Sequence, residues 1–470
     1  MQLVKEFFDQ LAPSRDKWAK KNSYYYRDLF SFLKFVVPSD SSVLEIGCAT
    51  GNLLAAVSPR KGMGIDFSSK MIEVAKEKYP SYEFKEMSVE NMFFSEKFDY
   101  IILADTVGYL DDIQKAFLKI KEICHPKTKL VITFYSYLWQ PILKLAEKLH
   151  LKKKLPLQNW LSPQDIDNFL SLAGFEVVKN GHRMLIPKYI PLISTLFNRY
   201  VAKLPFFRKL CVVNYVVARP TPEKSGGFSA SDHTVTVVIP ARNEQGNIES
   251  ALKRMPKFGS HLEIIFVEGN STDDTWGKIE RVQKTYPDLD IKIMKQDGRG
   301  KGDAVRKGFD AATGDILMIL DADLTVRPEE LPKFYSALVS GSGEFINGSR
   351  LVYPLSEDSM RILNILGNKF FSLMFSWLLD TRIKDTLCGT KVLWKEDYKK
   401  IKQGRSFFGE FDPFGDFDLL FGAFKINLKI VDLPIRYQAR VYGETNISRF
   451  SQGWLLLKMC FFAMKKIKFI

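Results

Sequence analysis

The sequence is poor in cysteine and has no long apolar run. Its five cysteines are odd in number and lie far apart without a Cys-x-x-Cys pair, which predicts reduced thiols rather than a disulfide framework or a zinc site. The first residues, MQLVKEFFDQ, lack the basic start and the apolar run of a signal peptide. About eighteen consecutive apolar residues, the length that a spanning helix needs, occur nowhere. These absences predict a cytoplasmic protein without a membrane-spanning helix.

Acidic residues are outnumbered, because Lys and Arg exceed Asp and Glu by 14. This balance predicts anionic partners, such as phosphorylated substrates or an acidic membrane surface. The sequence lacks a zinc-finger spacing, an Arg-rich arm and an RNA-binding aromatic motif, which argues against nucleic acid. With 470 residues and a 46% hydrophobic composition, the chain is long and apolar enough for two or three globular domains.

Residues 1–37 are predicted to be helical. A strand, a tight turn and a helix are predicted to follow them. The apolar run Val43–Ile46 indicates a buried strand, residues 47–51 (GCATG) a turn, and Asn52 the start of a helix. The small turn residues let the backbone approach a ligand closely, and Glu45 stands at the strand end to meet its polar atoms. Ala49 and Asn52 replace two glycines of the dinucleotide fingerprint, so a nicotinamide-type cofactor is disfavoured.

Asp66 ends the next predicted strand, GMGID, about twenty residues beyond the turn. An acidic side chain at this position can accept hydrogen bonds from both hydroxyls of a ribose. Ser68 or Ser69 is then expected to cap a helix, whose apolar residues repeat at helical spacing. The pattern therefore predicts a nucleoside-binding α/β domain.

Residues 20–180 resemble the class I S-adenosylmethionine-dependent methyltransferases through LEIGCATG, GIDFSSKMIEVAKEKY and FDYIILADTVGYLDD. The resemblance implies a Rossmann-like sheet and S-adenosyl-L-methionine as cofactor. It also implies positions around the cofactor: Glu45, Gly47 and Gly51 at the methionine end, Asp66 at the ribose, Glu90 near the adenine edge, and Asp105 facing the transferred methyl group. Transfer to a hydroxyl would also need a base. Asp105, Tyr109, His125 and Tyr135 are candidates, and their spacing singles out none of them.

The boundary between the two halves is predicted at residues 219–233, which are rich in Pro, Gly and Ser. This linker separates a first domain, residues 1–218, from a second domain, residues 234–470. Just before it, residues 181–219 combine prolines, aromatic residues and basic residues. They could complete the first domain's core or lie on a membrane face, and the sequence leaves both alternatives open.

Strand, loop and helix alternate four times after the linker. The fourth predicted strand, Ile316–Leu320, ends in Asp321-Ala322-Asp323. Because the middle residue turns away, both carboxylates can reach one divalent cation, and hard oxygen ligands suit Mg²⁺ or Mn²⁺. The earlier strands end at Pro240 and Glu268, and a glycine-rich basic turn precedes the fourth. Ser271 and Thr272, which follow Glu268, are able to cap the next helix. All these polar signatures fall at the carboxyl edge of the predicted sheet, where parallel sheets bind ligands.

Residues 234–450 resemble glycosyltransferase family 2, with the GT-A fold, and within it the dolichol-phosphate mannosyltransferase-like enzymes, which glycosylate polyprenyl phosphates. The motifs, in family order, are PARNE, VEGNSTDDT, GKGDA, DAD, GSR, DTLCGTK, FGDFDLL and YQARVYGETNISRF. The resemblance implies three groups of site residues: Pro240, Glu244, Glu268, Gly300 and Lys301 at the nucleotide sugar, Asp321 and Asp323 at the metal, and Arg350, Arg361 and Arg440 at the acceptor phosphate. VEGNST departs from the family pattern, as does Asn446 in GETNIS, where a lysine is usual.

Displacement of a nucleoside diphosphate builds negative charge on the leaving phosphate, which a metal held by Asp321 and Asp323 would stabilise. In-line attack from the opposite face implies inversion at the sugar carbon. A phosphate acceptor is already anionic, so arginines that orient it would suffice. A sugar hydroxyl would need a carboxylate base, for which Asp416 and Asp418 are the candidates. Helix capping or an ion pair is the alternative for both.

Two apolar segments predict interfacial amphipathic helices. Residues 361–379 carry a narrow polar stripe, and the C-terminal run GWLLLKMCFFAMKKIKFI ends in lysines. A core helix is the alternative for the first segment. The sequence thus predicts a bifunctional enzyme at the inner face of a membrane, which glycosylates a polyprenyl phosphate or glycan acceptor and methylates with S-adenosylmethionine. Two alternatives remain: a first domain that binds without catalysis, and a soluble hydroxyl acceptor.

Overall fold

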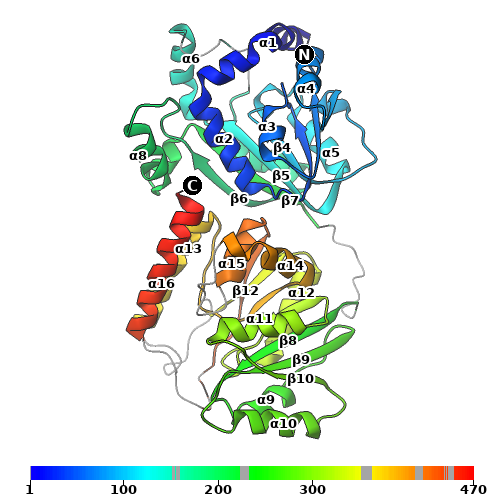
Figure 1. Ribbon diagram of the computed structural model, residues 1–470, viewed down its shortest axis with the longest axis vertical. Coiled ribbons are helices and arrows are strands. Elements are labelled where there is room, and N and C mark those ends of the chain that lie inside the picture. Colours follow the sequence, from blue (N-terminus) through cyan, green and yellow to red (C-terminus); the bar gives the residue numbers. More distant parts are fainter. Residues whose placement is uncertain are drawn as a thin grey trace. The chain divides into compact units, whose positions relative to one another are not determined.

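The chain divides into two compact units, and each contains a seven-stranded sheet (Figure 1). Unit 1 comprises residues 1–221 with 469–470, and unit 2 comprises residues 222–468. The computed structural model describes residues 2–150, 154, 159–222, 232–350, 362–407, 417–438, 440, 442 and 449–469. The prediction of an α/β protein with two domains is confirmed. Most of the predicted linker, residues 223–231, lies outside the described residues.

The sheet of unit 1 has the strand order β3-β2-β1-β4-β5-β7-β6. Its strands are β1 (Ser42–Ile46), β2 (Lys61–Asp66), β3 (Glu83–Glu86), β4 (Phe98–Ala104), β5 (Cys124–Tyr135), β6 (Phe175–Arg183) and β7 (Val213–Pro220). The first five run parallel, whereas β7 is antiparallel to both β5 and β6. The order reverses between β1 and β4, and the crevice outside the carboxyl ends of two such strands is where doubly wound sheets bind ligands.

Helices cover both faces of this sheet. They are α1 (Gln2–Lys21), α2 (Ser23–Val36), α3 (Asn52–Val57), α4 (Ser69–Lys78), α5 (Ile113–Glu122), α6 (Gln140–Lys148), α7 (Pro163–Leu172) and α8 (Ile193–Arg199). Neighbouring residues of β1 enter different cores, because Leu44 packs in the cluster of Phe117 and Val43 in the cluster of Leu33. The predicted cap is confirmed: Ser68 Oγ accepts a hydrogen bond from the backbone N–H of Met71 at 3.2 Å.

The sheet of unit 2 has the order β10-β9-β8-β11-β13-β12-β14. Its strands are β8 (Thr234–Ala241), β9 (His261–Glu268), β10 (Asp290–Lys295), β11 (Ile316–Ile319), β12 (Phe345–Ser349), β13 (Lys391–Trp394) and β14 (Ile430–Pro434). The four predicted strands, β8 to β11, are present and run parallel, whereas β13 is antiparallel to both of its neighbours. The strand order reverses between β8 and β11, which carry PARNE and DAD at their carboxyl ends.

The helices of unit 2 are α9 (Ile248–Lys253), α10 (Thr275–Thr285), α11 (Lys301–Ala311), α12 (Leu331–Val339), α13 (Ile362–Leu379), α14 (Lys395–Gln403), α15 (Phe417–Lys425) and α16 (Arg449–Ala463). The predicted capping of α10 by Ser271 or Thr272 is wrong, because its cap position is Asp274. Ser271 and Thr272 bind Asn243 instead: Ser271 Oγ accepts from its backbone N–H, and the Thr272 N–H donates to its side chain. They therefore tie the loop after β9 to the loop after β8.

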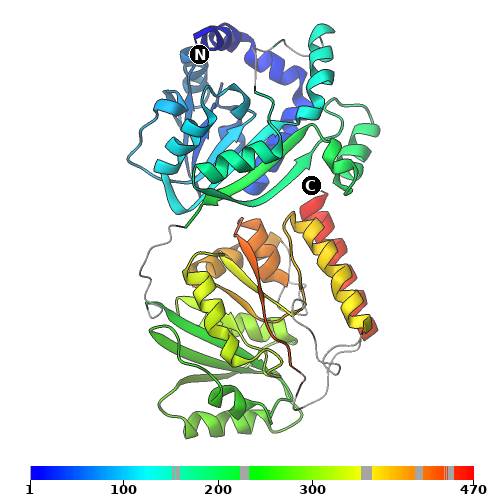
Figure 2. The ribbon, with the colours of Figure 1, turned by 180° about the vertical axis from the view of Figure 1, so that it is seen from behind.

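Helices α13 and α16 lie side by side along one flank of unit 2 (Figures 1 and 2). The polar stripe of α13 faces the protein, because the hydroxyls of Ser372 and Ser376 both donate to the carbonyl of Ile383. Apolar side chains of the pair face outward, with Leu373 74% and Trp454 60% exposed. Among the described residues, no helix is long and apolar enough to cross a membrane.

Candidate active sites

The turn after β1 is shaped by glycines with positive φ. Gly47 has a φ of 75° and Gly51 a φ of 77°, a region that residues with a Cβ rarely adopt. A Cβ added to Gly47 would lie 2.5 Å from the Thr106 side chain, so a larger residue does not fit. Ala49, which departs from the commoner glycine pattern, also adopts a positive φ of 46°. The turn therefore keeps its left-handed geometry despite the alanine.

Asp66 locks this turn to the end of β2. Its carboxylate accepts hydrogen bonds from the backbone N–H groups of Ala49 and Ser68, both at 2.9 Å. Burial raises the pKa of Asp66 to about 6, although the two N–H groups and the Arg15 guanidinium oppose this shift. Each carboxylate oxygen has a second lone pair, so Asp66 can still accept from hydroxyl groups of a ligand.

Glu45 carries an unsatisfied oxygen beside the turn. Its side chain is buried, and within the described part of the chain Oε2 makes no hydrogen bond. Burial raises the pKa of Glu45 well above its ordinary value. A buried polar atom without a partner destabilises the fold unless a ligand or water completes it. The ammonium group at the methionine end of S-adenosylmethionine is a donor of the required kind.

A small cavity of about 20 Å³ lies at the carboxyl edge of β1, β2 and β4. Gly47, Asp66 and Glu90 all line it, so the structure brings three of the predicted cofactor residues together. Glu90 is buried and accepts hydrogen bonds from the Ser88 hydroxyl and the backbone N–H of Asp111. The cavity wall is thus fixed by polar contacts before any ligand binds.

Asp105 lies just beyond β4 with a φ of 56°. Tyr25 donates its hydroxyl to Asp105 Oδ2 at 2.5 Å, and Thr133 donates to Oδ1 at 3.0 Å. Burial and the nearby Asp105 carboxylate raise the pKa of Tyr25 well above its ordinary value. Asp105 and Tyr135 line a second, smaller cavity, and a role for either at the methyl acceptor stays a prediction.

His125 lies at the opposite end of the strands from this cavity. It lies at the amino-terminal start of β5 and contacts Asp99, near the start of β4, at 3.2 Å. Asp105 and Tyr135 lie at the opposite, carboxyl ends of the same two strands. Because β4 and β5 are parallel, the candidate base His125 cannot serve this site.

Three residues of α1 join the cofactor loops, and the sequence pattern gave no sign of them. Asp9 accepts from the hydroxyl of Ser68 at 2.5 Å, and Asp16 accepts from Thr50 at 2.7 Å. Arg15 stacks on the ring of Tyr26 at 5.1 Å and acts electrostatically on the carboxylates of Glu45 and Asp66. Helical periodicity predicted the helix, but only the fold shows which of its polar residues meet the turn.

In unit 2, Asp321 and Asp323 are both paired with basic side chains. Lys301 Nζ lies 2.6 Å from Asp321 Oδ1, and Arg440 Nη2 lies 2.7 Å from Asp323 Oδ2. The other oxygen of Asp323 accepts from the backbone and the hydroxyl of Thr325. Burial opposes ionisation of Asp321, but Lys301 outweighs it and holds the pKa of Asp321 below its ordinary value.

Arg440 also joins the metal motif to the loop after β8. Its Nη1 lies 3.4 Å from Glu244 Oε1, and the other oxygen of Glu244 accepts from Asn247 at 2.7 Å. Burial raises the pKa of Glu244 to about 7. Arg440 is therefore placed between Asp323 and Glu244 rather than apart from the nucleotide-sugar residues.

The remaining predicted donor residues lie at the same edge of the sheet. The end of β8 pairs with the end of β9, with Pro240 opposite Val267 and Ala241 opposite Glu268. Glu268 Oε1 accepts from the backbone N–H of Ser271 at 2.5 Å. Gly300, with a φ of 86°, begins α11. The predicted nucleotide-sugar residues thus follow the carboxyl ends of neighbouring parallel strands.

Gly389, to which sequence reasoning gave no role, lies against the ion pair of Lys301 and Asp321. A Cβ added at Gly389 would overlap Asp321 Oδ2 and Lys301 Nζ. The backbone of the DTLCGTK motif must therefore approach this pair without a side chain. A glycine within a motif was the only sequence signal for such a contact.

The two carboxylates fit a divalent cation only in part. Among the described residues, no group of three or more His, Cys, Asp or Glu side chains could hold a metal ion. Asp321 and Asp323 supply hard oxygen ligands, and Mg²⁺ commonly completes its octahedron with water and substrate phosphates. The residues therefore fit a metal that binds together with a diphosphate.

Arg350 is committed to a buried ion pair. Its Nε and Nη2 donate to the two oxygens of Asp385 at 2.7 and 2.9 Å, and its backbone N–H donates to the same carboxylate. Both side chains are buried. This geometry holds the end of β12 to the DTLCGTK loop, and an acceptor-binding role for Arg350 stays a prediction. Arg361 lies outside the described residues.

Asp418 shows the ion-pair alternative. Its Oδ2 accepts from Arg306 Nε at 3.2 Å and from Arg405 Nε at 3.0 Å, and the carboxylate is buried. Two guanidinium groups therefore hold this carboxylate, as the ion-pair alternative expects. A catalytic role for Asp418 stays a prediction, and Asp416 lies outside the described residues.

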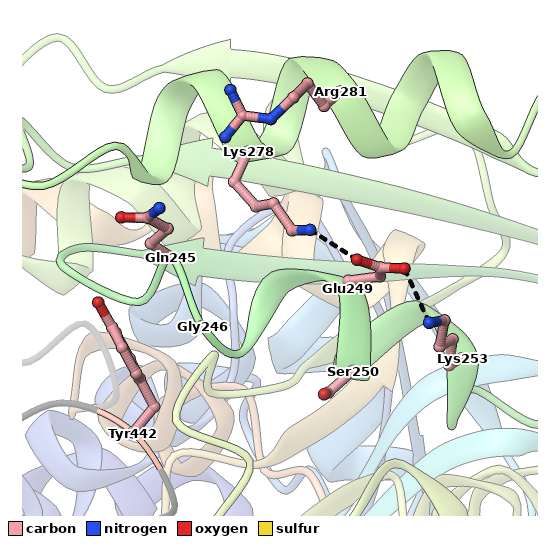
Figure 3. A pocket seen from close by; sticks show the side chains of 8 residues that line it. All are labelled: Gln245, Gly246, Glu249, Ser250, Lys253, Lys278, Arg281 and Tyr442. Atoms are coloured by element: carbon pink, nitrogen blue, oxygen red, sulfur yellow. Dashed lines mark hydrogen bonds and ion pairs between the residues drawn. The ribbon is translucent and has the colours of Figure 1, made fainter.

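An open pocket with about 800 Å³ of space lies beside the loop after β8 (Figure 3). It is lined by Gln245, Gly246, Glu249, Ser250, Lys253, Lys278, Arg281 and Tyr442. Figure 3 shows Lys253 and Lys278 both reaching Glu249, at 2.8 and 2.5 Å. These lysines lower the pKa of Glu249 to about 2. Arg281 pairs with Asp274, so each basic group of the pocket already has an acidic partner.

Two family models match the chain. The model described as a methyltransferase domain matches residues 18–180, and the model described as glycosyl transferase family 2 matches residues 236–401. These matches confirm both resemblances that the sequence motifs indicated. Each match covers about a third of the chain, and the motifs FGDFDLL and YQARVYGETNISRF lie beyond the second match.

The chain is similar to the dolichol-phosphate mannosyltransferase of Pyrococcus furiosus, with 31% identity over 222 residues, which are 45% of this chain and 59% of that protein. It spans between 35% and 59% of the length of the curated relatives it matches. Among solved structures, it is similar to an S-adenosylmethionine-dependent methyltransferase of Thermotoga maritima (16% identity, TM-score 0.38, 46% of this chain and 99% of that chain). It is also similar to glucosyl-3-phosphoglycerate synthase of Mycobacterium tuberculosis (18% identity, TM-score 0.38, 50% and 80%).

Proposed function

Because this chain contains a methyltransferase domain and a family 2 glycosyltransferase domain, we propose that it is a bifunctional enzyme. Unit 2 transfers a sugar from a nucleotide sugar to a polyprenyl phosphate with inversion, and unit 1 methylates with S-adenosylmethionine. The observation that carries the proposal is the meeting of Lys301, Asp321, Asp323 and Arg440 at the carboxyl edge of one parallel sheet. Charged groups of both signs at that edge suit a donor that brings a diphosphate and a metal together.

Asp321 and Asp323 would hold Mg²⁺ or Mn²⁺, which supplies positive charge to the leaving diphosphate. Lys301 and Arg440 now balance the two carboxylates, at 2.6 and 2.7 Å. With the carboxylates on the cation, Lys301 and Arg440 would donate to phosphate oxygens. Four groups already arranged at one edge reduce the reorganisation that the transition state requires.

A phosphate acceptor explains the observed partners better than a hydroxyl acceptor. Asp418 contacts Arg306 and Arg405, which is the ion-pair alternative to a role as the base. A polyprenyl phosphate is already anionic and needs orientation rather than a base. The similarity to a protein named dolichol-phosphate mannosyltransferase supports the same acceptor class. A glycan hydroxyl remains the second candidate, with Asp416 as its base.

The residues of unit 1 fit S-adenosylmethionine. The unsatisfied oxygen of Glu45 suits the ammonium group, and Asp66 and Glu90 line one cavity with Gly47. When bound, the cofactor supplies an electrophilic methyl group, while Asp105 and its partner Tyr25 lie at the acceptor side. A unit that binds the cofactor without catalysis is the alternative, because Asp105 already accepts two hydrogen bonds.

We place the enzyme at the inner, cytoplasmic face of a membrane. The outward apolar side chains of α13 and α16, with exposed lysines at Lys369 and Lys458, suit the interface of an anionic bilayer. Strongly exposed leucine and tryptophan side chains on two neighbouring surface helices are unfavourable in water. Such an interface would bring the glycosyltransferase site to a lipid-linked acceptor.

The test is a transfer assay with the purified chain, a panel of nucleotide sugars, Mg²⁺ or Mn²⁺, and a short-chain polyprenyl phosphate. A metal-dependent, lipid-extractable glycosylated product is the expected result. Product formed only with soluble glycans would support the hydroxyl acceptor. In parallel, calorimetry with S-adenosylmethionine and detection of S-adenosylhomocysteine separate a binding unit from a catalytic one: heat without turnover would support the non-catalytic alternative.

A further inference from the structure

Unit 1 has its own large apolar surface. Within the described residues of this unit, all but three of the large exposed hydrophobic side chains lie in residues 137–149 and 189–210. The exceptions are Phe93, Leu118 and Leu172. We call the two segments the apolar apron. Contiguous exposed apolar surface of this kind marks a docking site rather than an ordinary solvent face.

The two segments of the apron are connected to each other. Trp139 Nε1 donates to the carbonyl of Leu210 at 2.8 Å, and the backbone N–H of Ser136 donates to the carbonyl of Val212 at 2.7 Å. In both views of the ribbon, α6 and α8 lie on the same side of unit 1, away from α5 (Figures 1 and 2). The apron is therefore one surface built from segments distant in sequence.

The second segment is folded with its polar residues inward. Ser194 is buried, where its hydroxyl accepts from the N–H of Ile190 and donates to the carbonyl of Lys188. Asn198 is also buried, and its side-chain oxygen accepts from the backbone N–H groups of residues 185 and 186 at 2.7 and 2.9 Å. These two polar residues lie four apart, on one face of α8. The apolar residues are consequently forced outward.

The outward side chains are large and strongly exposed: Leu192 is 85% exposed, Leu196 54% and Phe206 76%. An arrangement in α8 that buries a hydroxyl and an amide while exposing leucine is the reverse of a water-facing helix. Helix α13 of unit 2 also exposes a leucine, Leu373, although its Phe375 and Leu378 are buried. The inversion in α8 therefore indicates an apolar environment for the apron.

The charged residues of the apron favour an anionic bilayer as its partner. Between residues 184 and 210 the sequence has five Lys and Arg residues and no Asp or Glu. Lys188, Arg199 and Lys209 are exposed beside the apolar side chains. Residues 137–149 add Lys144, Lys148 and one acidic residue, Glu147. Apolar residues that can enter the acyl boundary, flanked mainly by basic residues, match a bilayer with anionic headgroups. A protein partner would have to supply both an apolar groove and an acidic rim.

The apron begins next to the cavity of the methyltransferase site. Tyr135 lines the small cavity with Asp105, and Tyr137, two residues further, is exposed in the apron. From this placement, and resting on the proposed function, we propose that the apron docks unit 1 on an anionic bilayer and that its methyl acceptor is a lipid-linked molecule. In the reaction, a C–O bond to the acceptor hydroxyl forms as the C–S bond of the sulfonium breaks, and the hydroxyl proton passes to a carboxylate or water at the cavity.

The first test measures directly whether the apron inserts into a bilayer. All five native cysteines are buried, so Leu192→Cys in the full-length chain can be labelled selectively with an environment-sensitive fluorophore. We expect a blue shift and brighter emission with phosphatidylcholine vesicles that contain phosphatidylglycerol. Leu118→Cys, an exposed leucine on α5, is the matched control and should not respond. A Leu192 probe that stays unchanged while the chain binds these vesicles would overturn the proposal.

The second test reads the consequence for methylation. Leu192→Ser with Leu196→Ser should weaken vesicle binding by about tenfold, because two apolar side chains no longer enter the bilayer. Calorimetric affinity for S-adenosylmethionine should be unchanged, and methylation of lipid-extractable material should fall. The matched variant Leu373→Ser on α13 should weaken vesicle binding without changing the Leu192 probe response. If the double variant methylates lipid-linked material at the normal rate, the proposed acceptor class is wrong.

These readouts separate this proposal from the proposed function. Probe insertion at Leu192 does not depend on any activity, whereas the glycosylated lipid product does not depend on the apron. If the Leu192 probe inserts but no sugar is transferred, the docking surface is supported and the glycosyltransferase function of unit 2 is refuted. A probe that is shielded before vesicles are added, in a chain that migrates as a dimer, would show that a second copy covers the apron and would refute lipid docking.

Discussion

The ammonium group of Lys301 lies 2.6 Å from Oδ1 of Asp321. Arg440 Nη2 likewise lies 2.7 Å from Oδ2 of Asp323. Each carboxylate of the DAD motif is therefore paired with a basic side chain of the same protein. A metal that binds with the donor must compete with these contacts. Metal and donor are therefore expected to bind together, because the diphosphate can accept hydrogen bonds from Lys301 and Arg440 when the metal displaces them.

Asp321→Asn with Asp323→Asn should abolish glycosyl transfer, since two amides retain the shape but lose the charge that holds the cation. The fold should persist, as judged by circular dichroism and by unchanged affinity of unit 1 for S-adenosylmethionine. In the native chain, chelation should stop transfer and added Mn²⁺ should restore it. Normal turnover of the double variant would contradict the assignment of the metal site.

Cofactor affinity should depend on pH through Asp66. Burial raises the pKa of its carboxyl to about 6, and the ionised form is the one that accepts from ribose hydroxyls. Affinity for S-adenosylmethionine should therefore be lost as the pH falls from 8 to 5 through this value. Asp66→Asn should bind at least about tenfold more weakly, with a flatter pH profile, by calorimetry. An unchanged native profile across this range would refute the role of Asp66.

Asp66 affects the free energy of unfolding with the opposite pH dependence: a rise in pH strengthens cofactor binding but lowers stability. Between its ordinary value of 3.8 and about 6, the folded chain binds a proton at Asp66 that the unfolded chain does not. Its contribution to the free energy of unfolding is therefore present below this window and is lost as the pH rises through 6. Relative to Asp66→Asn, the native chain should lose stability between pH 4 and pH 7, as urea unfolding at fixed temperature would show.

Arg350→Ala should lower the free energy of unfolding by about 3–5 kcal/mol, because the change leaves the carboxylate of Asp385 buried without its partner. Arg281→Ala is the matched control, since Arg281 pairs with Asp274 on the exposed surface and its loss should cost less than about 1 kcal/mol. Urea unfolding measures both. A stable Arg350→Ala variant with a raised KM for the acceptor alone would support an acceptor-binding role instead.

Local pattern predicted the strands and their ends, because short apolar runs that stop at polar residues are visible in sequence. Asp66, Glu268 and Asp321 could be placed at a carboxyl edge for this reason. Their partners could not be predicted: Arg440 is 117 residues from Asp323, and no spacing connects the two. Such contacts depend on the pairing of the segment after β11 with the segment after β14, where Val326 forms a bridge with Tyr437.

The failed prediction at α10 has the same cause. Ser271 and Thr272 precede the helix at positions where capping is common, yet both bind Asn243 in the neighbouring loop. A tertiary partner thus displaced the local one. In α1, helical spacing predicted the helix but gave no sign that Asp9 and Asp16 would hold the cofactor loops. Side chains of one helix face look alike in sequence whether they meet solvent or a site.

Gly389→Ala is the smallest change that separates the donor site from the rest of unit 2. The added Cβ would overlap both Asp321 Oδ2 and Lys301 Nζ, so either the ion pair or the backbone of the DTLCGTK loop must shift. We expect glycosyl transfer to fall by at least about a hundredfold, because displacement of a metal ligand by even 1 Å removes the alignment of the reacting groups.

Gly367→Ala in α13 is the control for this substitution, since an added Cβ there meets no atom within 4 Å. It should leave transfer unchanged and, as a helix interior position, should slightly stabilise the fold. Steady-state kinetics of the two variants at saturating metal measure the difference. Because Gly389→Ala adds one methyl group and no charge, equal turnover of the two variants would mean that Lys301 and Asp321 need not lie this close to the loop, and that the donor is bound elsewhere along the sheet edge.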